Sequence, residues 1–323
     1  KNNLISSVME ITEVGTDENG PYVIGNGSLW CDGLRIYEVA NMGMRIVPGD
    51  GDASSPSSVP VVVNRSSHPH LADHAIKGIP VVPVAYALEW FARCAAAHLP
   101  ALRLVELSDL KVISGIAANG YAAGDDLELL VAAQTVETSA GHTIVRIELR
   151  DTTSNRLRYS CFATLGDDPP APNRSGSLFD AALLADTAGE RSLYEGGVLF
   201  HGPAFQVITS VPTISESGLV ASVTGIVEQD WPAEPWVTDP ALLDGALQLA
   251  LLWTEHLQGR PSLPTGIAQV RIYGLPAEGA CVATLSGRDS TKSKVTCDVV
   301  FRDAQGETVA ELVGIETHCL PGS

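Results

Sequence analysis

The chain lacks a long apolar segment, a cysteine framework and an excess of basic side chains. Without a run of about eighteen apolar residues or an apolar N-terminal stretch, it predicts neither a membrane span nor a secretion signal, and we expect a cytoplasmic protein. The six cysteines are scattered and form no Cys-x-x-Cys pair, which argues against a disulfide framework and a zinc site. A formal net charge of −18 argues against a nucleic-acid partner, because such binding requires clustered Lys and Arg.

What the chain does contain is enough apolar material, 45% of 323 residues, for a full core. Two polar stretches rich in Gly, Pro, Ser and Asp, at 48–58 and 166–177, have no periodic apolar face and predict linkers. We therefore expect an N-terminal strand segment and linker over 1–58, a first domain over 59–166, a linker over 167–185 and a second domain over 186–323.

Each of these two domains contains one long apolar helix followed or surrounded by strands. Pro83 suits the first turn of a helix over 83–98, since proline has no N–H to lose there. Asp239 is an expected N-cap before Pro240, and this second helix should continue to about His256. Alternating or β-branched segments predict strands at 127–137, 142–151, 157–166, 207–215, 218–227, 281–287, 294–303 and 307–318.

The N-terminal segment permits two interpretations. Residues 22–47 form a strand, turn and strand pattern loosely similar to 297–320 at the other end of the chain. One interpretation is the closing strand pair of an upstream domain in a longer protein. The other is an ordinary N-terminal hairpin of this domain.

Three short motifs contain the residue types of an acid–base site. The segment HPHLADHAIKGIPVVP contains His74, Gly78 and Pro83 in the pattern His-x-x-x-Gly-x-x-x-x-Pro. The segment LFHGPAFQ follows at 199–206, and DPALLDGALQLALLW, at 239–253, has Asp244 and Gln248 one helical turn apart. Each motif alone is weak, whereas their order and spacing together are specific.

This order and spacing resemble the dehydratase domains of polyketide synthases and of the related polyunsaturated fatty acid synthases, over roughly residues 60 to 320. The resemblance implies an α+β tandem (double) hotdog fold, in which each half is an antiparallel sheet wrapped around a long central helix. It also implies His74 as catalytic base and Asp244 as catalytic acid. Val84 after Pro83, where modular members commonly have glycine, favours the iterative and polyunsaturated fatty acid synthases.

The chemistry of dehydration suits these residue types. A 3-hydroxyacyl thioester needs a base for its α-proton, and neutral His74 in an apolar tunnel is available for that task. Asp244 lies among leucines and alanines, and desolvation raises the pKa of a carboxyl group toward that of a general acid. Gln248 can orient this carboxyl, and a backbone N–H near Gly78 or at the helix beginning at Pro83 can polarise the thioester carbonyl.

Several residues depart from the family pattern or permit a second interpretation. Gly202 and Pro203 match a Tyr-Gly-Pro element, but His201 replaces its tyrosine, and we expect it to line the tunnel. Arg271 is either a contact for the phosphopantetheine phosphate or an exposed strand arginine. His68 and His70 precede His74, but no nearby carboxylate or cysteine completes a ligand set, so we expect no metal site.

We therefore expect a 3-hydroxyacyl-[acyl-carrier-protein] dehydratase that needs no cofactor, with its substrate on the phosphopantetheine of an acyl carrier protein. Its expected partners are that carrier and neighbouring synthase domains, with neither nucleic acid nor membrane, and a homodimer is compatible with the pattern. One alternative is an enoyl-thioester isomerase, since the same pair can move a double bond. A second alternative is a scaffolding hotdog domain without activity.

Overall fold

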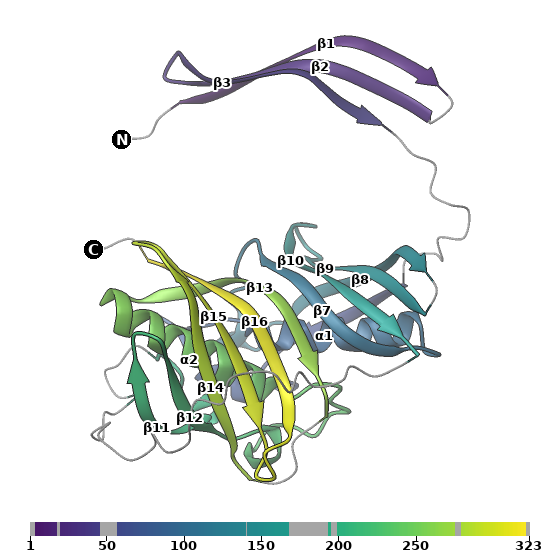
Figure 1. Ribbon diagram of the computed structural model, residues 1–323. Coiled ribbons are helices and arrows are strands. Elements are labelled where there is room, and N and C mark those ends of the chain that lie inside the picture. The colour runs from purple at the N-terminus through teal and green to yellow at the C-terminus, as the bar shows by residue number, and fades with distance from the viewer. Residues whose placement is uncertain are drawn as a thin grey trace. The chain divides into compact units, whose positions relative to one another are not determined.

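The computed structural model describes residues 4–17, 20–45, 57–139, 141–167, 193–194, 199–274 and 279–320 (Figure 1). The chain forms two compact units, residues 1–53 and residues 54–323, and each is described by itself. We call them the N-terminal unit and the main unit. The linker predicted over 167–185 lies almost entirely outside the described residues, as does most of the polar stretch at 48–58.

The N-terminal unit is a three-stranded antiparallel sheet of β1 (Ile5–Asp17), β2 (Gly20–Cys31) and β3 (Leu34–Arg45). The expected hairpin corresponds to β2 and β3, and β1 adds a third strand that the pattern did not predict. In register, Val14 faces Val23 and Val23 faces Met44, so these three side chains share one side of the sheet. Both interpretations of this segment stay predictions.

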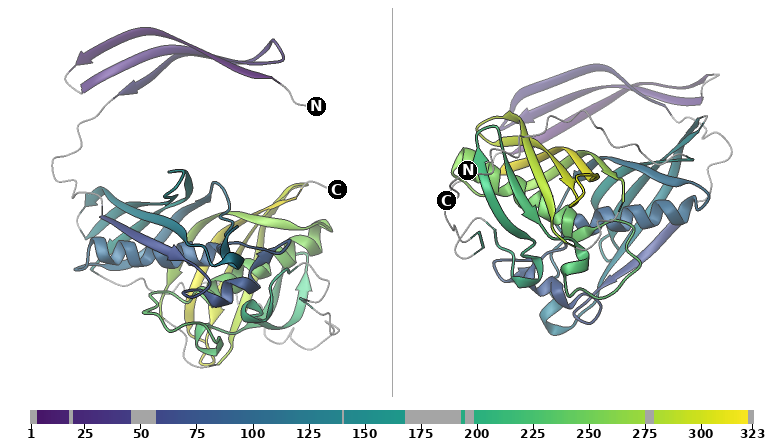
Figure 2. Two further views of the ribbon diagram at one scale, coloured as in Figure 1. Left: turned by 180° about the vertical axis from the view of Figure 1, so that it is seen from behind. Right: turned by 60° about the horizontal axis from the view of Figure 1, so that its bottom comes forward.

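The main unit is built on one antiparallel sheet of eleven strands, in the order β11-β12-β14-β15-β16-β13-β7-β10-β9-β8-β4. The strands are β4 (Ser57–Val63), β7 (Arg103–Val112), β8 (Leu127–Ser139), β9 (His142–Asp151), β10 (Leu157–Gly166), β11 (Ile208–Ser215), β12 (Gly218–Val223), β13 (Ser262–Ile272), β14 (Cys281–Ser290), β15 (Lys294–Arg302) and β16 (Thr308–Cys319). Its two long helices are α1 (Val84–His98) and α2 (Pro240–Gln258). Figures 1 and 2 show each helix enclosed by its own part of the sheet.

The strand order repeats a single plan twice. After α1 the chain runs into β7, and β8, β9 and β10 then return so that β10 lies beside β7. After α2 it runs into β13, and β14, β15 and β16 return so that β16 lies beside β13. The two halves join where β7 pairs with β13, and α1 and α2 also contact each other. This arrangement confirms the predicted tandem hotdog fold.

Both central helices are apolar around most of their circumference and are correspondingly buried. Helix α1 begins at Val84, with Pro83 as its N-cap residue. In α2 the Asp239 carboxylate accepts a hydrogen bond from the N–H of Leu242 at 2.8 Å, as an N-cap does. The helix ends at Gln258, two residues later than predicted, and Gly259 follows as the C-cap in the left-handed conformation (φ 62°).

Two strands of the sheet, β4 and β7, are missing from the sequence prediction, and β13 was expected only through the interpretation of Arg271 as an exposed strand arginine. Ser57 and Ser58, assigned to the linker by their composition, begin β4 and pair with β8. In β7 the alternation of apolar residues is broken at Asp109, which has a φ of 50° beside a register shift against β10. In β13 a similar shift lies between Pro264 and Gly266.

Two further findings concern composition. All six cysteines are free, four of them buried, which agrees with their place in apolar segments. Neither α1 nor α2, nor any other helix in the described ranges, is long and apolar enough to cross a membrane.

Candidate active site

His74 follows the short 3-10 helix η1 (Pro69–Asp73) and faces the interior of the main unit. Its Nδ1 lies 2.7 Å from the carbonyl oxygen of Val81, which can only accept, so Nδ1 bears the proton. This bond leaves the lone pair of Nε2 free and directs it toward Asp244. The hairpin of β5 (Ala75–Ile76) and β6 (Ile79–Pro80), closed by Gly78 at a φ of 79°, brings Val81 back to the histidine.

Asp244 lies in the second turn of α2, with a side chain only 3% exposed. Gln248, one turn later, donates a hydrogen bond from Nε2 to Asp244 Oδ2 at 2.7 Å. The same Nε2 donates to the carbonyl of Phe205 at 2.8 Å, and Gln248 Oε1 accepts from the hydroxyl of Tyr194 at 2.9 Å. These bonds fix the amide with one N–H toward the carboxyl group and the other toward the carbonyl of Phe205.

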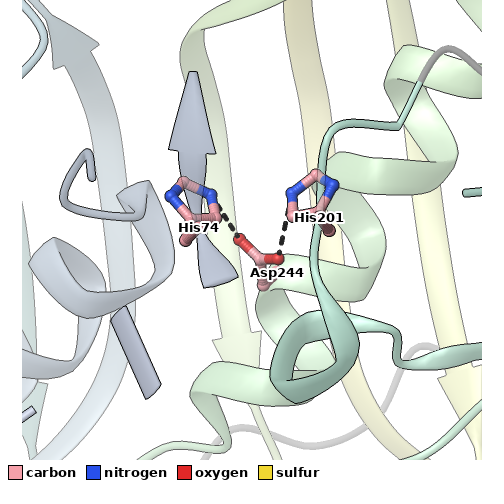
Figure 3. A group of neighbouring side chains, drawn as sticks. All are labelled: His74, His201 and Asp244. Carbon is pink, nitrogen blue, oxygen red and sulfur yellow. Dashed lines mark ion pairs between the residues drawn. The ribbon is translucent and has the colours of Figure 1, made fainter. Parts of the chain in front are cut away.

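His201 completes the group from the other side of Asp244 (Figure 3). Its Nε2 lies 3.7 Å from Asp244 Oδ2, while His74 Nε2 lies 3.9 Å from Oδ1. The carboxyl group therefore has one oxygen toward each imidazole. His201 stacks on Phe200, with ring centroids 4.2 Å apart, and its side chain is 2% exposed.

The buried setting shifts the pKa of each of these groups. Desolvation lowers the pKa of His74, an effect that the nearby Asp244 carboxylate partly opposes. Desolvation raises the pKa of Asp244, opposed in turn by His74 and by the hydrogen bond from Gln248. Burial and the neighbouring His74 both lower the pKa of His201, to well below 6.5. All three shifts favour neutral imidazoles and a protonated carboxyl group.

Two loops, one from each half, hold the site together. The carbonyl of Asp73 accepts a hydrogen bond from the N–H of Gly202 at 2.7 Å. The Asp73 carboxylate accepts another from the N–H of Ala204 at 2.8 Å, just after Pro203 opens the 3-10 helix η4 (Pro203–Phe205). Asp73 thus connects the loop before His74 to the loop after His201.

The site opens into a cavity of about 160 Å³ lined by both halves of the main unit. Its walls are mainly aliphatic, from residues such as Val82, Val112, Ile116, Leu247 and Leu251. The polar groups of His74, His201, Asp244 and Gln248 gather in this same cavity. An apolar passage with a few convergent polar groups suits a ligand with a hydrocarbon chain and one reactive polar centre.

The N-terminus of α1 also reaches the cavity. Val84, its first residue, lines the wall, and Pro83 supplies no side-chain cap to the first N–H groups of the helix. Uncapped N–H groups and the helix dipole stabilise negative charge. Gly78, by contrast, is not among the residues lining this cavity, and its part in the structure is the turn that returns Val81 to His74.

Arg271 lies on β13 and pairs with Glu106, with Nη2 2.7 Å and Nε 2.8 Å from Oε2 of that carboxylate. Its side chain is 32% exposed and is not among the residues lining the cavity. A contact between Arg271 and phosphopantetheine stays a prediction. Sequence reasoning did not identify Asp73, because a single aspartate beside a motif shows no sign of its partner 131 residues away.

The histidines before the motif have separate partners. His68 Nδ1 lies 2.8 Å from the hydroxyl of Ser67, and His70 Nε2 bonds to the hydroxyl of Tyr86. His70 also stacks on Trp231 at a centroid separation of 4.6 Å. The ring of His70 also contacts Phe205, whose ring in turn contacts His74.

His74, His201 and Asp244 are the described residues whose donor atoms lie close enough, within 4.8 Å of one another, to suggest a metal site. Zinc ligands at about 2.0–2.1 Å lie roughly 3.4 Å apart around a tetrahedral ion. The histidine nitrogens lie 3.9 and 3.7 Å from the carboxylate oxygens. These distances are longer than those of a closed zinc site.

Comparisons with known proteins extend these observations. A family model described as "Polyketide synthase dehydratase N-terminal domain" matches residues 186–323, the segment that includes α2 and Asp244. One component of the polyunsaturated fatty acid synthase from Thraustochytrium sp. (strain ATCC 26185 / S-3) is 27% identical over 264 residues, which cover 71% of this chain and 9% of that component. The chain therefore spans a small part of that curated relative.

Solved structures match over most of the chain. A dehydratase domain of a mycocerosic acid synthase-like polyketide synthase, crystal form 1, superposes with a TM-score of 0.63 at 22% identity, covering 81% of this chain and 91% of its own. A trans-acyltransferase polyketide synthase enoyl-isomerase superposes with a TM-score of 0.61 at 15% identity, covering 81% of this chain and 99% of its own. At these identities the likeness shows the fold alone.

The eleven-stranded sheet around two central helices, with one cavity lined from both halves, makes the main unit a tandem hotdog protein. The chain is similar to the dehydratase domains of polyketide synthases over residues 186–323, and to a polyunsaturated fatty acid synthase over 71% of its length.

Proposed function

We propose that this domain eliminates water from a 3-hydroxyacyl thioester and releases a 2-enoyl thioester. The observation that supports this most directly is the pairing of His74 and Asp244 across the two halves, 3.9 Å apart in a largely apolar cavity. Dehydration needs a base and an acid at adjacent carbons of one substrate. A neutral imidazole beside a buried carboxyl group meets both needs.

In this proposal His74 Nε2 removes the proton from the carbon next to the thioester carbonyl. Its Nδ1–H, bonded to Val81, holds the ring in place and stabilises the imidazolium that forms. Asp244 donates its proton to the departing hydroxyl group, which leaves as water. Gln248 then stabilises the carboxylate through its bond to Oδ2.

The thioester carbonyl gains negative charge as the α-proton leaves. The uncapped N-terminus of α1, where Val84 lines the cavity, is a backbone feature suited to stabilise that charge. The aliphatic walls would hold the acyl chain, and burial there excludes water that competes for the same protons. The protein only takes up one proton and gives up another while the C–O bond breaks and the double bond forms, and we propose that no cofactor takes part.

We also propose that the substrate arrives on the phosphopantetheine of an acyl carrier protein in a multidomain synthase, with neighbouring synthase domains as partners. The relative named above supports this, because the chain matches 9% of a much longer synthase component. The six free cysteines suit the reducing cytoplasm where we place the protein. A chain with a formal charge of −18 should attract an acidic carrier protein only weakly. We therefore propose that the carrier is covalently tethered to this domain, because a tether raises its effective concentration at the site.

The test is mass spectrometry of carrier-bound 3-hydroxyhexanoyl substrate, in both hydroxyl configurations, with wild-type protein, His74→Ala and Asp244→Asn. We expect a loss of about 18 Da with the wild type. Each variant should lower the rate by about 10²-fold or more. If the wild type gives no mass loss in either configuration or at other chain lengths, the dehydratase proposal is wrong and a scaffolding role becomes the better explanation.

A further inference from the structure

The cavity contains one polar side chain that the proposed chemistry does not use. Its lining includes His74, His201, Asp244 and Gln248, which form the acid–base group, and the remaining polar side chain is Tyr159. Tyr159 lies on β10 and is only 2% exposed. Burial of a hydroxyl group is unfavourable unless the group gains a hydrogen-bond partner, so a phenol in an otherwise apolar part of the wall needs an explanation.

The hydroxyl group of Tyr159 can donate a hydrogen bond to a molecule in the cavity. Burial raises the pKa of Tyr159 to about 12, and the charge of Arg158 and the N–H of Ile116 oppose this shift only in part. The group therefore keeps its proton at neutral pH. Among the described residues, the backbone neighbour of its oxygen is that N–H, which is a donor and provides no acceptor for the O–H hydrogen.

Tyr159 lies near the place where the cavity meets the surface. In register it faces Val112 of β7, and its oxygen adjoins Ile116. Both of these residues line the cavity, and so does Gly115, which is exposed. Asp244, by contrast, lies on the central helix α2 with a side chain only 3% exposed. A substrate that enters beside Gly115 passes the Tyr159 hydroxyl before it reaches the carboxyl group.

The backbone between Tyr159 and His74 indicates how far apart the two side chains act. His74 Nδ1 lies 2.7 Å from the carbonyl oxygen of Val81, and the N–H of Val82 donates to the carbonyl of Ile116 at 2.9 Å. One strand spacing of about 4.8 Å thus separates the segment beside His74 from the segment beside Tyr159. With a side-chain contact at each end, the hydroxyl lies on the order of 10 Å from the imidazole.

This separation matches one acceptor in the arm of a carrier-bound thioester. In a pantetheine thioester, the carbonyl oxygen of the amide nearest the sulfur lies about seven bonds from the carbon that His74 would deprotonate. An extended chain advances about 1.3 Å per bond, which places that oxygen roughly 8–9 Å from this carbon. The arm occupies the part of the cavity toward the surface, where Tyr159 lies.

We propose that Tyr159 donates a hydrogen bond to the carbonyl oxygen of this first amide and thereby selects thioesters whose arm contains it. The inference rests on the proposed dehydration, because that reaction places the reacting carbon at His74. An oxygen atom on the acyl chain offers the same kind of acceptor. The acyl chain, however, extends from His74 in the other direction, away from the arm.

The experiment compares two 3-hydroxyhexanoyl thioesters of similar length with the full chain. The N-acetylcysteamine thioester keeps the first amide, and the n-pentyl thioester replaces it with methylene groups. Wild-type protein should dehydrate the amide-containing thioester with a kcat/KM about 5-fold or more higher. Tyr159→Phe should abolish this preference through a higher KM for the amide-containing thioester, with little change in kcat, because the bond forms equally in the ground state and the transition state.

Two controls accompany this comparison. Tyr273→Phe removes a hydroxyl group that donates to Glu311 and lies outside the cavity lining, so it should keep the wild-type preference. The n-pentyl thioester of 3-hydroxy-7-oxooctanoic acid has a carbonyl oxygen on the acyl chain instead of the arm, and Tyr159→Phe should convert it as the wild type does. Thermal unfolding of both variants checks that they fold.

Several results would overturn the inference. A wild type without preference for the amide-containing thioester would refute it and leave dehydration standing. An equal loss of kcat/KM for both hexanoyl thioesters in folded Tyr159→Phe would give the hydroxyl a structural role. A loss confined to the 7-oxo substrate would assign the bond to the acyl chain. If the wild type dehydrated none of these thioesters, the proposed function and this inference would fail together.

Discussion

The contact between Gly202 and Asp73 gives a prediction whose size follows from the structure. A Cβ added at Gly202 would lie 2.8 Å from both Cγ and Oδ1 of Asp73 and 2.9 Å from its Cβ. Heavy atoms do not pack this closely, so Gly202→Ala must push the two loops apart. That movement strains the two hydrogen bonds from Gly202 and Ala204 to Asp73, which join the halves beside His74 and His201.

Overpacking of this kind costs about 1–3 kcal/mol of unfolding free energy. The displaced loop continues to Phe205, whose carbonyl positions Gln248 against Asp244. Turnover should therefore fall by about 10-fold or more as the acid loses its alignment. Gly274→Ala is the matched control, because a Cβ at Gly274 meets no atom within 4 Å.

The measurement is urea unfolding together with dehydration of a 3-hydroxyacyl pantetheine thioester. Asp73→Gly removes all three clashing atoms, and a double variant with Gly202→Ala should lose less than the sum of the two single effects. Unchanged stability and turnover in Gly202→Ala would refute this account of how the loops are joined. If the losses of the two single variants simply add in the double variant, they do not arise from the contact between Gly202 and Asp73.

Three further predictions follow from buried polar groups. Glu89 is fully buried and accepts hydrogen bonds from the N–H groups of Val237 and Thr238, so Glu89→Gln should lower unfolding free energy by about 2–4 kcal/mol in urea titrations, and an unchanged midpoint would contradict this. Gln248→Leu should reduce kcat by about 10-fold or more with little change in KM, whereas an effect on KM alone would mean that Gln248 only contacts substrate. Burial lowers the pKa of His70 to about 4 from 6.5, so the folded state disfavours its protonation. Unfolding free energy should fall by at most about 3 kcal/mol between pH 6.5 and 4, and His70→Phe should lose that component.

The helices and most strands could be predicted because each has a strong local signal. Helix α2 has an N-cap at Asp239, proline at its first position and glycine after its last turn, and these act within a few residues of one another. Strands such as β9 and β15 alternate regularly between buried and half-buried side chains. A local signal of either kind needs no knowledge of the rest of the fold.

The seam between the halves could not be predicted in the same way. Strands β7 and β13 form that seam, and Asp109 and Pro264 interrupt their alternation where the register shifts. The register shifts lie between β7 and β10 and between β13 and β16, so each is set by pairing with a strand distant in sequence. The third strand of the N-terminal unit, β1, was not predicted, because the strand, turn and strand pattern was recognised only in the segment that follows it.

The same division holds for the site. The motifs identified His74, His201, Asp244 and Gln248 as candidates, and the structure brings all four into one cavity. It leaves Gly78 in a turn outside that cavity and Arg271 in a pair with Glu106. Hydrogen bonds from Val81 and Tyr194 fix His74 and Gln248, and Asp73 holds the backbone of the loop after His201. Only the folded chain reveals such partners, because they are distant in sequence or use backbone atoms.

The central claim is that His74 and Asp244, from different halves, act as one catalytic unit. Its most direct test is a kinetic double-mutant cycle of wild type, His74→Ala, Asp244→Asn and the double variant, assayed for dehydration of one 3-hydroxyacyl pantetheine thioester. If the two residues act together, the double variant should be no slower than the slower single variant. Rate losses that multiply in the double variant would contradict a shared active site.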